Sequence, residues 1–255
     1  MRLAALGAAL AASLCLAACG SSGGSATPPP QGAPTLRHPA AEVDAALAAE
    51  QMRAQLVTAS SLYGVGQRAD SQAHMNAAAA AYTKITDRVR RGDALLDHEI
   101  IAAFPVIAGQ IVKKEAPPTV ENRMGMIQGQ LLNAAITNAV SLSTRNDPTL
   151  AAQVTLDLAR EAQRDYAVAA KNVGSPESRH AFQDSFGLFT RALAVIRGIG
   201  PALGPERVKA IGALGAAHND GFPLGVLQPK SLQVAKVNAD VARLEAAIAQ
   251  RFRVS

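Results

Sequence analysis

The residues of this chain that could do chemistry are its histidines, a few carboxylates and one cysteine. His180 and Asp184 stand four residues apart, so their side chains can meet if the segment is helical. A carboxylate beside an imidazole can orient the ring for metal binding or proton transfer, and the same spacing is typical of an ordinary surface pair. The pair is therefore a candidate metal or solute site, with the surface pair as its alternative.

Other combinations lack the spacing that known catalytic sites require. His98-Glu99 would suit a zinc-protease helix only with a second histidine four residues after the first, where the chain has Ala102. Asp97 and these two neighbours fan out around a helix, so we expect a solvated polar face there. No Gly-x-Ser-x-Gly turn joins a predicted strand to a helix, and no Gly-Lys-Ser or Gly-Lys-Thr loop is present. We therefore predict no catalytic residue, no cofactor and no enzymatic activity.

Cys19 closes the segment Leu16-Ala17-Ala18-Cys19, which follows a basic residue and a short apolar run. A basic end, an apolar segment too short to span a bilayer and small residues at a cleavage point are typical of a secretion signal. With cysteine at that point, the segment resembles the lipobox of bacterial lipoproteins. The resemblance implies a lipid-modified, palmitate-type anchor on Cys19 in the cell envelope. The residue after Cys19 is Gly20 and not aspartate, so the resemblance also implies that the protein is anchored in the outer membrane and faces the periplasm.

Composition narrows the class of the remaining chain. Removal of 18 residues from 255 leaves 237, enough for a sizeable core. Cys15 lies in the signal and Cys19 would carry lipid, so no thiol remains for a disulfide or a zinc site. The net charge of +5 is spread along the chain without a basic block, so we expect no nucleic-acid partner. The expected partners are the membrane, through the anchor, and an envelope protein.

The chain divides into three parts. Residues 1–18 form the predicted signal peptide, and 19–39 are a Gly/Ser-rich and then Pro-rich tether, in which His38 has no expected role. Residues 40–255 are rich in alanine, contain no tryptophan and show helical periodicity, so we predict an all-α domain, an antiparallel bundle of seven or eight helices. We expect helix starts after Asp147, Ser175 and Ser231, and a kink or break at Pro105.

Three short segments resemble an uncharacterised family of secreted all-helical proteobacterial proteins. They are Met52 to His74, Asp165 to Gly187, and the final helix around Val241 and Leu244. The family pattern has a second histidine, next to proline, three residues after the first, and this chain lacks it. The resemblance implies a ligand site among the retained positions, which are Tyr63, His74, Tyr166, Gln183 and Asp184. The alternative for each of these residues is a hydrogen bond between helices.

The sequence thus predicts a membrane-tethered envelope lipoprotein with a non-catalytic helical domain that binds a partner protein or a small ligand. The alternative is a metal or solute capture protein that serves an envelope uptake system, centred on His74 or on His180 and Asp184.

Overall fold

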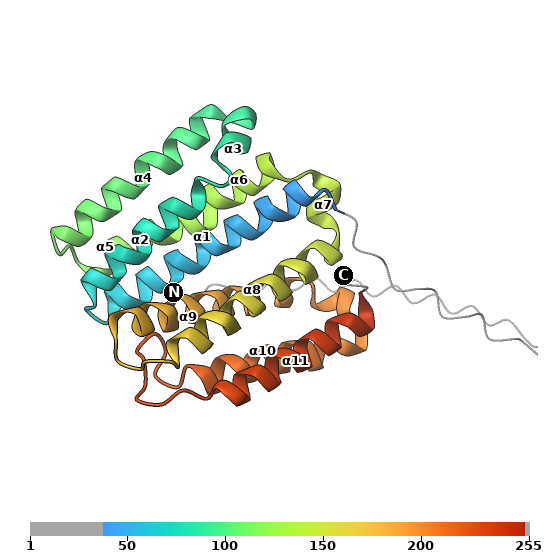
Figure 1. Ribbon diagram of the computed structural model, residues 1–255. Helices are drawn as coiled ribbons and strands as arrows, with labels where there is room; N and C mark the ends of the chain where they lie inside the picture. Colours follow the sequence, from blue (N-terminus) through green and yellow to red (C-terminus); the bar gives the residue numbers. More distant parts are fainter. Residues whose placement is uncertain (1–37, 253–255) are drawn as a thin grey trace, which may run out of the picture. The chain divides into compact units, whose positions relative to one another are not determined.

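The computed structural model describes residues 38–252, and within this range the chain is helical and contains no strand (Figure 1). The predicted all-α class is therefore confirmed. The α-helices are α1 (Ala40–Gly64), α2 (Arg68–Tyr82), α3 (Thr86–Gly92), α4 (Ala94–Val112), α5 (Pro117–Met126), α6 (Leu132–Ala139), α7 (Leu142–Asn146), α8 (Pro148–Ala169), α9 (Pro176–Gly198), α10 (Arg207–Gly221) and α11 (Val234–Arg251). A π-helix, η1 (Ile127–Leu131), joins α5 to α6, and a 3-10 helix, η2 (Gly200–Glu206), precedes α10.

These helices outnumber the seven or eight expected because short interruptions divide the long periodic segments. The segment that the sequence presents as one helix from Met75 to Arg91 is split at Thr83 into α2 and α3. Pro105 does not divide α4; it lies on the exposed side of the helix, where the carbonyl that its ring leaves unpaired can meet water.

Helix α1 is the central element of the described chain. It packs against α2, α9, α5, α8 and α6, and its buried residues face nearly every direction around its axis. Many of them are alanines, such as Ala49 and Ala59, which are fully buried. A helix that is apolar on all sides is suited to the interior, and small side chains let several neighbours approach it closely.

One close approach is between α1 and α9. A Cβ atom on Gly187 would stand 2.5 Å from the carbonyl oxygen of Ala54 and would clash with Oγ1 of Thr58. No side chain fits there, so glycine at this position lets the two backbones touch. This contact fixes the polar residues at the start of α9 opposite those of α1 and α2.

A cluster of aromatic rings joins α8, α9 and the end of α10. Phe222 lies among Tyr166, Phe182, Phe186 and Phe189, with ring centroids 5.0 to 5.9 Å from its own. Phe182 and Phe189 lie on one face of α9, and both are fully buried. Phe222 lies just after α10 ends.

Local capping signals place two helix starts correctly and one incorrectly. The Asp147 side chain accepts from the backbone N–H of Thr149 at the start of α8, and Ser175 caps α9 in the same way. Ser231 does not cap the last helix: α11 begins at Val234, and no side chain caps it.

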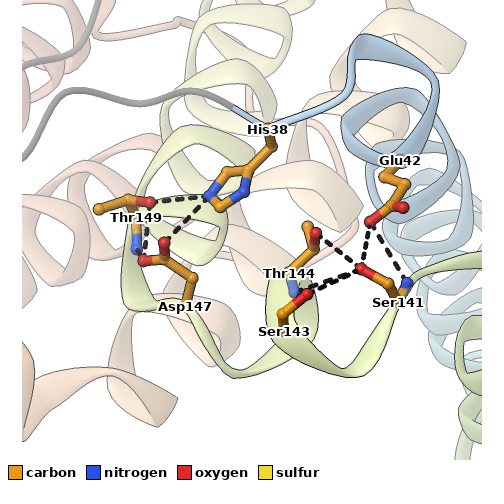
Figure 2. A network of polar contacts seen from close by, with 7 residues as sticks. All are labelled: His38, Glu42, Ser141, Ser143, Thr144, Asp147 and Thr149. Atoms are coloured by element: carbon orange, nitrogen blue, oxygen red, sulfur yellow. Dashed lines mark hydrogen bonds and ion pairs between the residues drawn. The ribbon is translucent and has the colours of Figure 1, made fainter.

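His38 and Glu42 fasten the start of α1 to the α7–α8 corner (Figure 2). His38 Nε2 lies 2.8 Å from Thr149 Oγ1 and 3.5 Å from Asp147 Oδ2, and Glu42 accepts a hydrogen bond from the Ser141 hydroxyl. His38, expected to be an idle tether residue, is thus part of the folded domain. The predicted signal peptide, Cys19 and the tether as far as residue 37 lie outside the described residues.

Candidate functional site

Four of the six predicted ligand residues meet in one place, between α1, α2 and α9. We call this group the His74 cluster. Its members are Gln55 on α1, Asp70 and His74 on α2, and Arg179, His180, Gln183 and Asp184 on α9. Spacing along the chain accounts for the members within one helix, but only the packing of α2 against α1 and of α1 against α9 brings the three groups together.

Two glutamine side chains hold the imidazole of His74 from opposite sides. Gln55 Oε1 lies 2.7 Å from Nδ1, and Gln183 Oε1 lies 3.1 Å from Nε2. Each amide is oriented by its nitrogen, which donates to a carboxylate: Gln55 to Asp184 at 2.9 Å and Gln183 to Asp70 at 3.0 Å. Both ring nitrogens therefore lie against amide oxygens, and the imidazole is held between α1 and α9.

Two carboxylates belong to the polar group around the ring. Asp184 Oδ1 lies 3.4 Å from His74 Nδ1. Burial alone would raise the pKa of Asp70, but the hydrogen bond from Gln183 and the charges of Arg179 and His180 outweigh it and lower that pKa below its ordinary value. Asp70 is therefore an ionised carboxylate within a buried polar group.

The expected pairing of His180 with Asp184 is replaced by contacts to other helices. His180 Nε2 lies 3.5 Å from Asp70 Oδ1, and its ring centroid is 6.1 Å from that of His74. Asp184 instead accepts from Gln55 and faces His74. Because α1 offers the amide of Gln55 to Asp184 and α2 offers the carboxylate of Asp70 to His180, each residue finds its partner on another helix.

The donor set of the cluster does not fit a metal ion. Within residues 38–252, no three His, Cys, Asp or Glu side chains converge in a way that would hold one. Both nitrogens of His74 are already engaged by amide oxygens, so a metal would have to displace a glutamine. The arrangement can instead connect three helices through buried hydrogen bonds.

The remaining two predicted residues, Tyr63 and Tyr166, lie at other contacts between elements. The Tyr63 hydroxyl donates to the carbonyl of Glu115 at 2.5 Å, which joins the end of α1 to the segment between α4 and α5. The Tyr166 hydroxyl donates to the carbonyl of Gly221 and accepts from the backbone N–H of Gln233, both at 3.1 Å. Both tyrosines therefore make hydrogen bonds between elements, which is the alternative to a ligand site that the sequence left open.

Asp165 on α8 is a titratable group beside the cluster. Burial raises its pKa, and the charges of Asp184 and Glu161 raise it further, to about 7. Glu161 accepts a hydrogen bond from Gln51 of α1 at 2.6 Å. The seam between α1, α8 and α9 thus contains a carboxyl group that changes charge near neutral pH.

A second candidate site, which the sequence did not indicate, is a groove between α2, α3 and α4. We call it the α2–α4 groove. It has a volume of about 380 Å³ and is lined by Ala79, Tyr82, Thr83, Thr86, Arg90, Ile101 and Phe104. Its walls are mainly apolar, and its polar groups gather near Arg90.

Asp97 organises the polar end of this groove. Its carboxylate accepts from the Tyr82 hydroxyl at 2.8 Å, from the Thr86 hydroxyl at 2.6 Å and from Arg90 Nε at 2.8 Å. Burial and the hydrogen bond to Asp97 raise the pKa of Tyr82, so its hydroxyl stays a donor. Burial would raise the pKa of Asp97, but its three hydrogen bonds and the charge of Arg90 lower it on balance.

The expectation of a solvated polar face is wrong for Asp97 and right for its neighbours. Asp97 is only 3% exposed, whereas His98 and Glu99 are exposed. The sequence feature that could have indicated its burial is that Asp97 is the one aspartate on the apolar side of α4, seven residues after Arg90. Only the packing of α2 and α3 against α4 shows that the two side chains meet.

Comparisons with models of protein families, with curated proteins and with solved structures gave no match. The resemblance to secreted helical proteins therefore stays a prediction. Function has to be argued from the residues and their geometry.

Proposed function

We propose that this chain is a lipid-anchored protein of the cell envelope, attached through Cys19 to the outer membrane and facing the periplasm. Its helical domain, for which we propose an antiparallel bundle, is non-catalytic and binds a small amphiphile with a carboxylate head. The observation that carries the proposal is the α2–α4 groove, with apolar walls and a partly free guanidinium at one end.

The dimensions and chemistry of the groove support this ligand class. Its volume of about 380 Å³ lies in the range of small-molecule sites, which are mostly apolar with a few polar groups. Arg90 donates through Nε to Asp97, and its outer nitrogens make only long contacts, Nη1 at 3.8 Å from Asp87 Oδ1 and Nη2 at 3.5 Å from the Thr86 hydroxyl. Its side chain remains 55% exposed, so we propose that a ligand carboxylate replaces these two contacts and binds the guanidinium in two-pronged fashion. Ile101 and Phe104 offer contact to an apolar chain.

Binding of dodecanoate to the full chain, measured by titration calorimetry, tests the proposal. Dodecanol is the matched ligand without charge, and we expect it to bind roughly tenfold or more weakly because it lacks the charge-assisted hydrogen bond to Arg90. Thr83→Trp, which fills the groove from an exposed position, should abolish binding. Val208→Trp, at an exposed position on α10, is the control. Binding that persists in Thr83→Trp, or equal binding of acid and alcohol, would contradict the proposal.

The anchor is tested separately by chemical labelling. We expect radioactive palmitate to be incorporated into the chain in cells and to be lost in Cys19→Ser. Cys15→Ser, which alters only the predicted signal peptide, should keep the label. Labelling that survives in Cys19→Ser would mean that the anchor lies elsewhere.

Capture of a metal or solute at the His74 cluster is the second candidate. The observation in its favour is that two histidines and two aspartates from facing helices, among them His74 and His180, gather in one place. Zn²⁺ titration of the full chain, with His180→Ala as the variant and the exposed His98→Ala as the control, tests it. Stoichiometric binding lost only in His180→Ala would favour capture. Because both ring nitrogens of His74 are hydrogen-bonded, an ion that bound there would have to displace Gln55 or Gln183, and the absence of stoichiometric Zn²⁺ binding would rule out metal capture.

A further inference from the structure

The side of α4 that faces away from the other helices is apolar over much of its length. Ile101 and Val106 are each 45% exposed and Val112 is 73% exposed, and Ala102 and Pro105 between them are exposed as well. We call these five residues the α4 surface. They lie in a stretch of thirteen uncharged residues between Glu99 and Lys113, a length of about 20 Å along a helix.

Only the opposite side of α4 is covered by protein. Ile100, Phe104, Ile107 and Ile111 are buried and face α2, α3, α5 and η1. By length and composition α4 is apolar enough to cross a membrane, yet only 33% of its apolar window is buried within the domain. An apolar strip of this kind is typical of a surface that meets another apolar phase.

The far end of the strip is cationic. Lys113 and Lys114 follow Val112 directly, and both are exposed. The exposed acidic residues of the α3–α4 region, Asp87, Asp93 and Glu99, come before the α4 surface in the chain. Glu115, which follows the two lysines, is half-buried and accepts a hydrogen bond from Gln110 Nε2 at 2.9 Å. An apolar face that ends in two lysines matches an anionic lipid surface, with apolar side chains among the headgroups and ammonium groups at the phosphates.

The end of α1 lies at the same end of the domain. The hydrogen bond from Tyr63 to the carbonyl of Glu115 joins the two helix ends at 2.5 Å. Val65, just beyond α1, is 52% exposed, and Arg68 at the start of α2 is also exposed. The apolar and cationic character of Val112 and the two lysines therefore continues onto a neighbouring turn.

We propose that the α4 surface, with Lys113 and Lys114, docks on an anionic membrane surface. This inference rests on the proposed lipid anchor, because the anchor places a bilayer within reach of the domain. It also deepens the proposed function, because Ile101 belongs both to the α4 surface and to the wall of the α2–α4 groove. A ligand that partitions into the bilayer would meet the groove at this face.

The area of the α4 surface favours a bilayer over a second protein. A strip about 20 Å long on a helix about 10 Å across offers roughly 200 Å². A stable protein–protein interface needs about 800 Å² per partner and a rim of hydrogen-bonding groups. The strip is too small and too uniformly apolar for that, whereas a weak contact with lipid is sufficient for a domain already held at the membrane.

A tryptophan reporter tests the docking directly, because the chain has no native tryptophan. Full-length Cys19→Ser protein carrying Val106→Trp is mixed with vesicles of phosphatidylcholine alone or with 30% phosphatidylglycerol. We expect a blue shift of emission with the anionic vesicles and none for Val208→Trp, whose parent valine is 80% exposed on α10. A shift that is absent, or equal for the two reporters, would overturn the proposal.

The contribution of the two lysines is measured by co-sedimentation with the same vesicles. Lys113→Gln with Lys114→Gln should lower the partition coefficient on anionic vesicles roughly 30-fold. The control pair Lys171→Gln with Lys230→Gln, at exposed positions elsewhere, should leave it unchanged. Equal binding by the two pairs would refute the docking mode.

The oligomeric state in solution is a further check. If the chain formed a dimer that Val106→Asn converts to a monomer, and did not bind vesicles, the proposal would be overturned and the α4 surface would be assigned to contact with a second copy. The side chains substituted within residues 38–252 are all exposed, and unchanged circular dichroism confirms folding.

Discussion

At the scale of single residues, two glutamines set the chemistry of His74. Each amide nitrogen is held by a carboxylate, so each amide oxygen is turned toward the ring. His74 is 3% exposed, and both of its ring nitrogens are hydrogen-bonded. Its role is to join α2 to α1 and α9.

Removal of that ring should destabilise the fold. We expect His74→Ala to lower the free energy of unfolding by about 2–4 kcal/mol, because it leaves two buried amide oxygens without partners and opens a cavity. His98→Ala, at an exposed position on α4, should change it by no more than about 0.5 kcal/mol. Urea denaturation of both variants checks this, and similar midpoints would contradict the connecting role.

Asp165 makes stability depend on pH near neutrality. Its pKa is about 7 in the folded chain against an ordinary value of 3.8, so between these values the folded state holds a proton that the unfolded state has released. The contribution of Asp165 to the free energy of unfolding therefore falls as pH rises from about 4 to about 7, and stays low above that.

Asp165→Asn should remove this dependence. Allowing for solvent screening of the half-buried side chain, we expect the variant to be about 1–2 kcal/mol more stable than the parent at pH 8 and equal to it at pH 4. Asp44→Asn, at an exposed position on α1, serves as the control. Thermal unfolding across this pH range measures the difference, and a stabilisation that is the same at both pH values would argue against titration of Asp165.

At the scale of elements, Gly187 determines how closely α1 and α9 pack. Its Cα lies against backbone atoms of Ala54, which have no rotamer to move aside. The resemblance to secreted helical proteins includes this glycine, and the structure supplies a physical reason for it.

A methyl group at that position should separate the two helices. We expect Gly187→Ala to cost about 2–4 kcal/mol of stability because backbone must shift. Gly212→Ala on α10, where a Cβ meets nothing within 4 Å, should instead stabilise the protein by about 0.5–1 kcal/mol through better helix propensity. Denaturant unfolding gives both values, and a neutral Gly187→Ala would show that the crossing is looser than described.

The sequence predicts elements well where the signal is local. Asp147 and Ser175 cap helices because a side chain two or three residues ahead of an N–H can reach it whatever lies around it. The break at Thr83 and the start of α11 have no such signal, since packing against other helices decides them. Asp97 looked solvated for the same reason: its partners lie on other helices.

The candidate sites, too, could be predicted only where a local pattern indicates them, and not where packing brings residues together. Asp70, His74 and Gln183 are brought together by helix packing, and a family-like pattern, not spacing, indicated two of them. The groove at Tyr82 and Arg90 had no sequence pattern, because a cavity is formed by the shape of its walls and not by residue type.

At the scale of the whole domain, the start of α1 is fixed at a corner formed by α7 and α8 (Figure 2). His38 → Ala should release this end. We expect faster backbone hydrogen exchange in residues 40–45, because the start of α1 loses its hydrogen bond to Thr149 and keeps only that between Glu42 and Ser141. The exchange of α8 and α9 should be unchanged, since Thr149 still bonds to Asp147. Mass spectrometry of exchanged peptides measures this, with His98→Ala as the control. Unchanged protection would mean that His38 contributes nothing to the attachment.

The attachment of His38 also determines where mechanical load enters the domain. A pull applied to the chain at His38 would reach Thr149 on α8 and its cap residue Asp147 as well as the first turn of α1. The load would then be shared by two helices that pack against each other and would not fall on one helical turn alone.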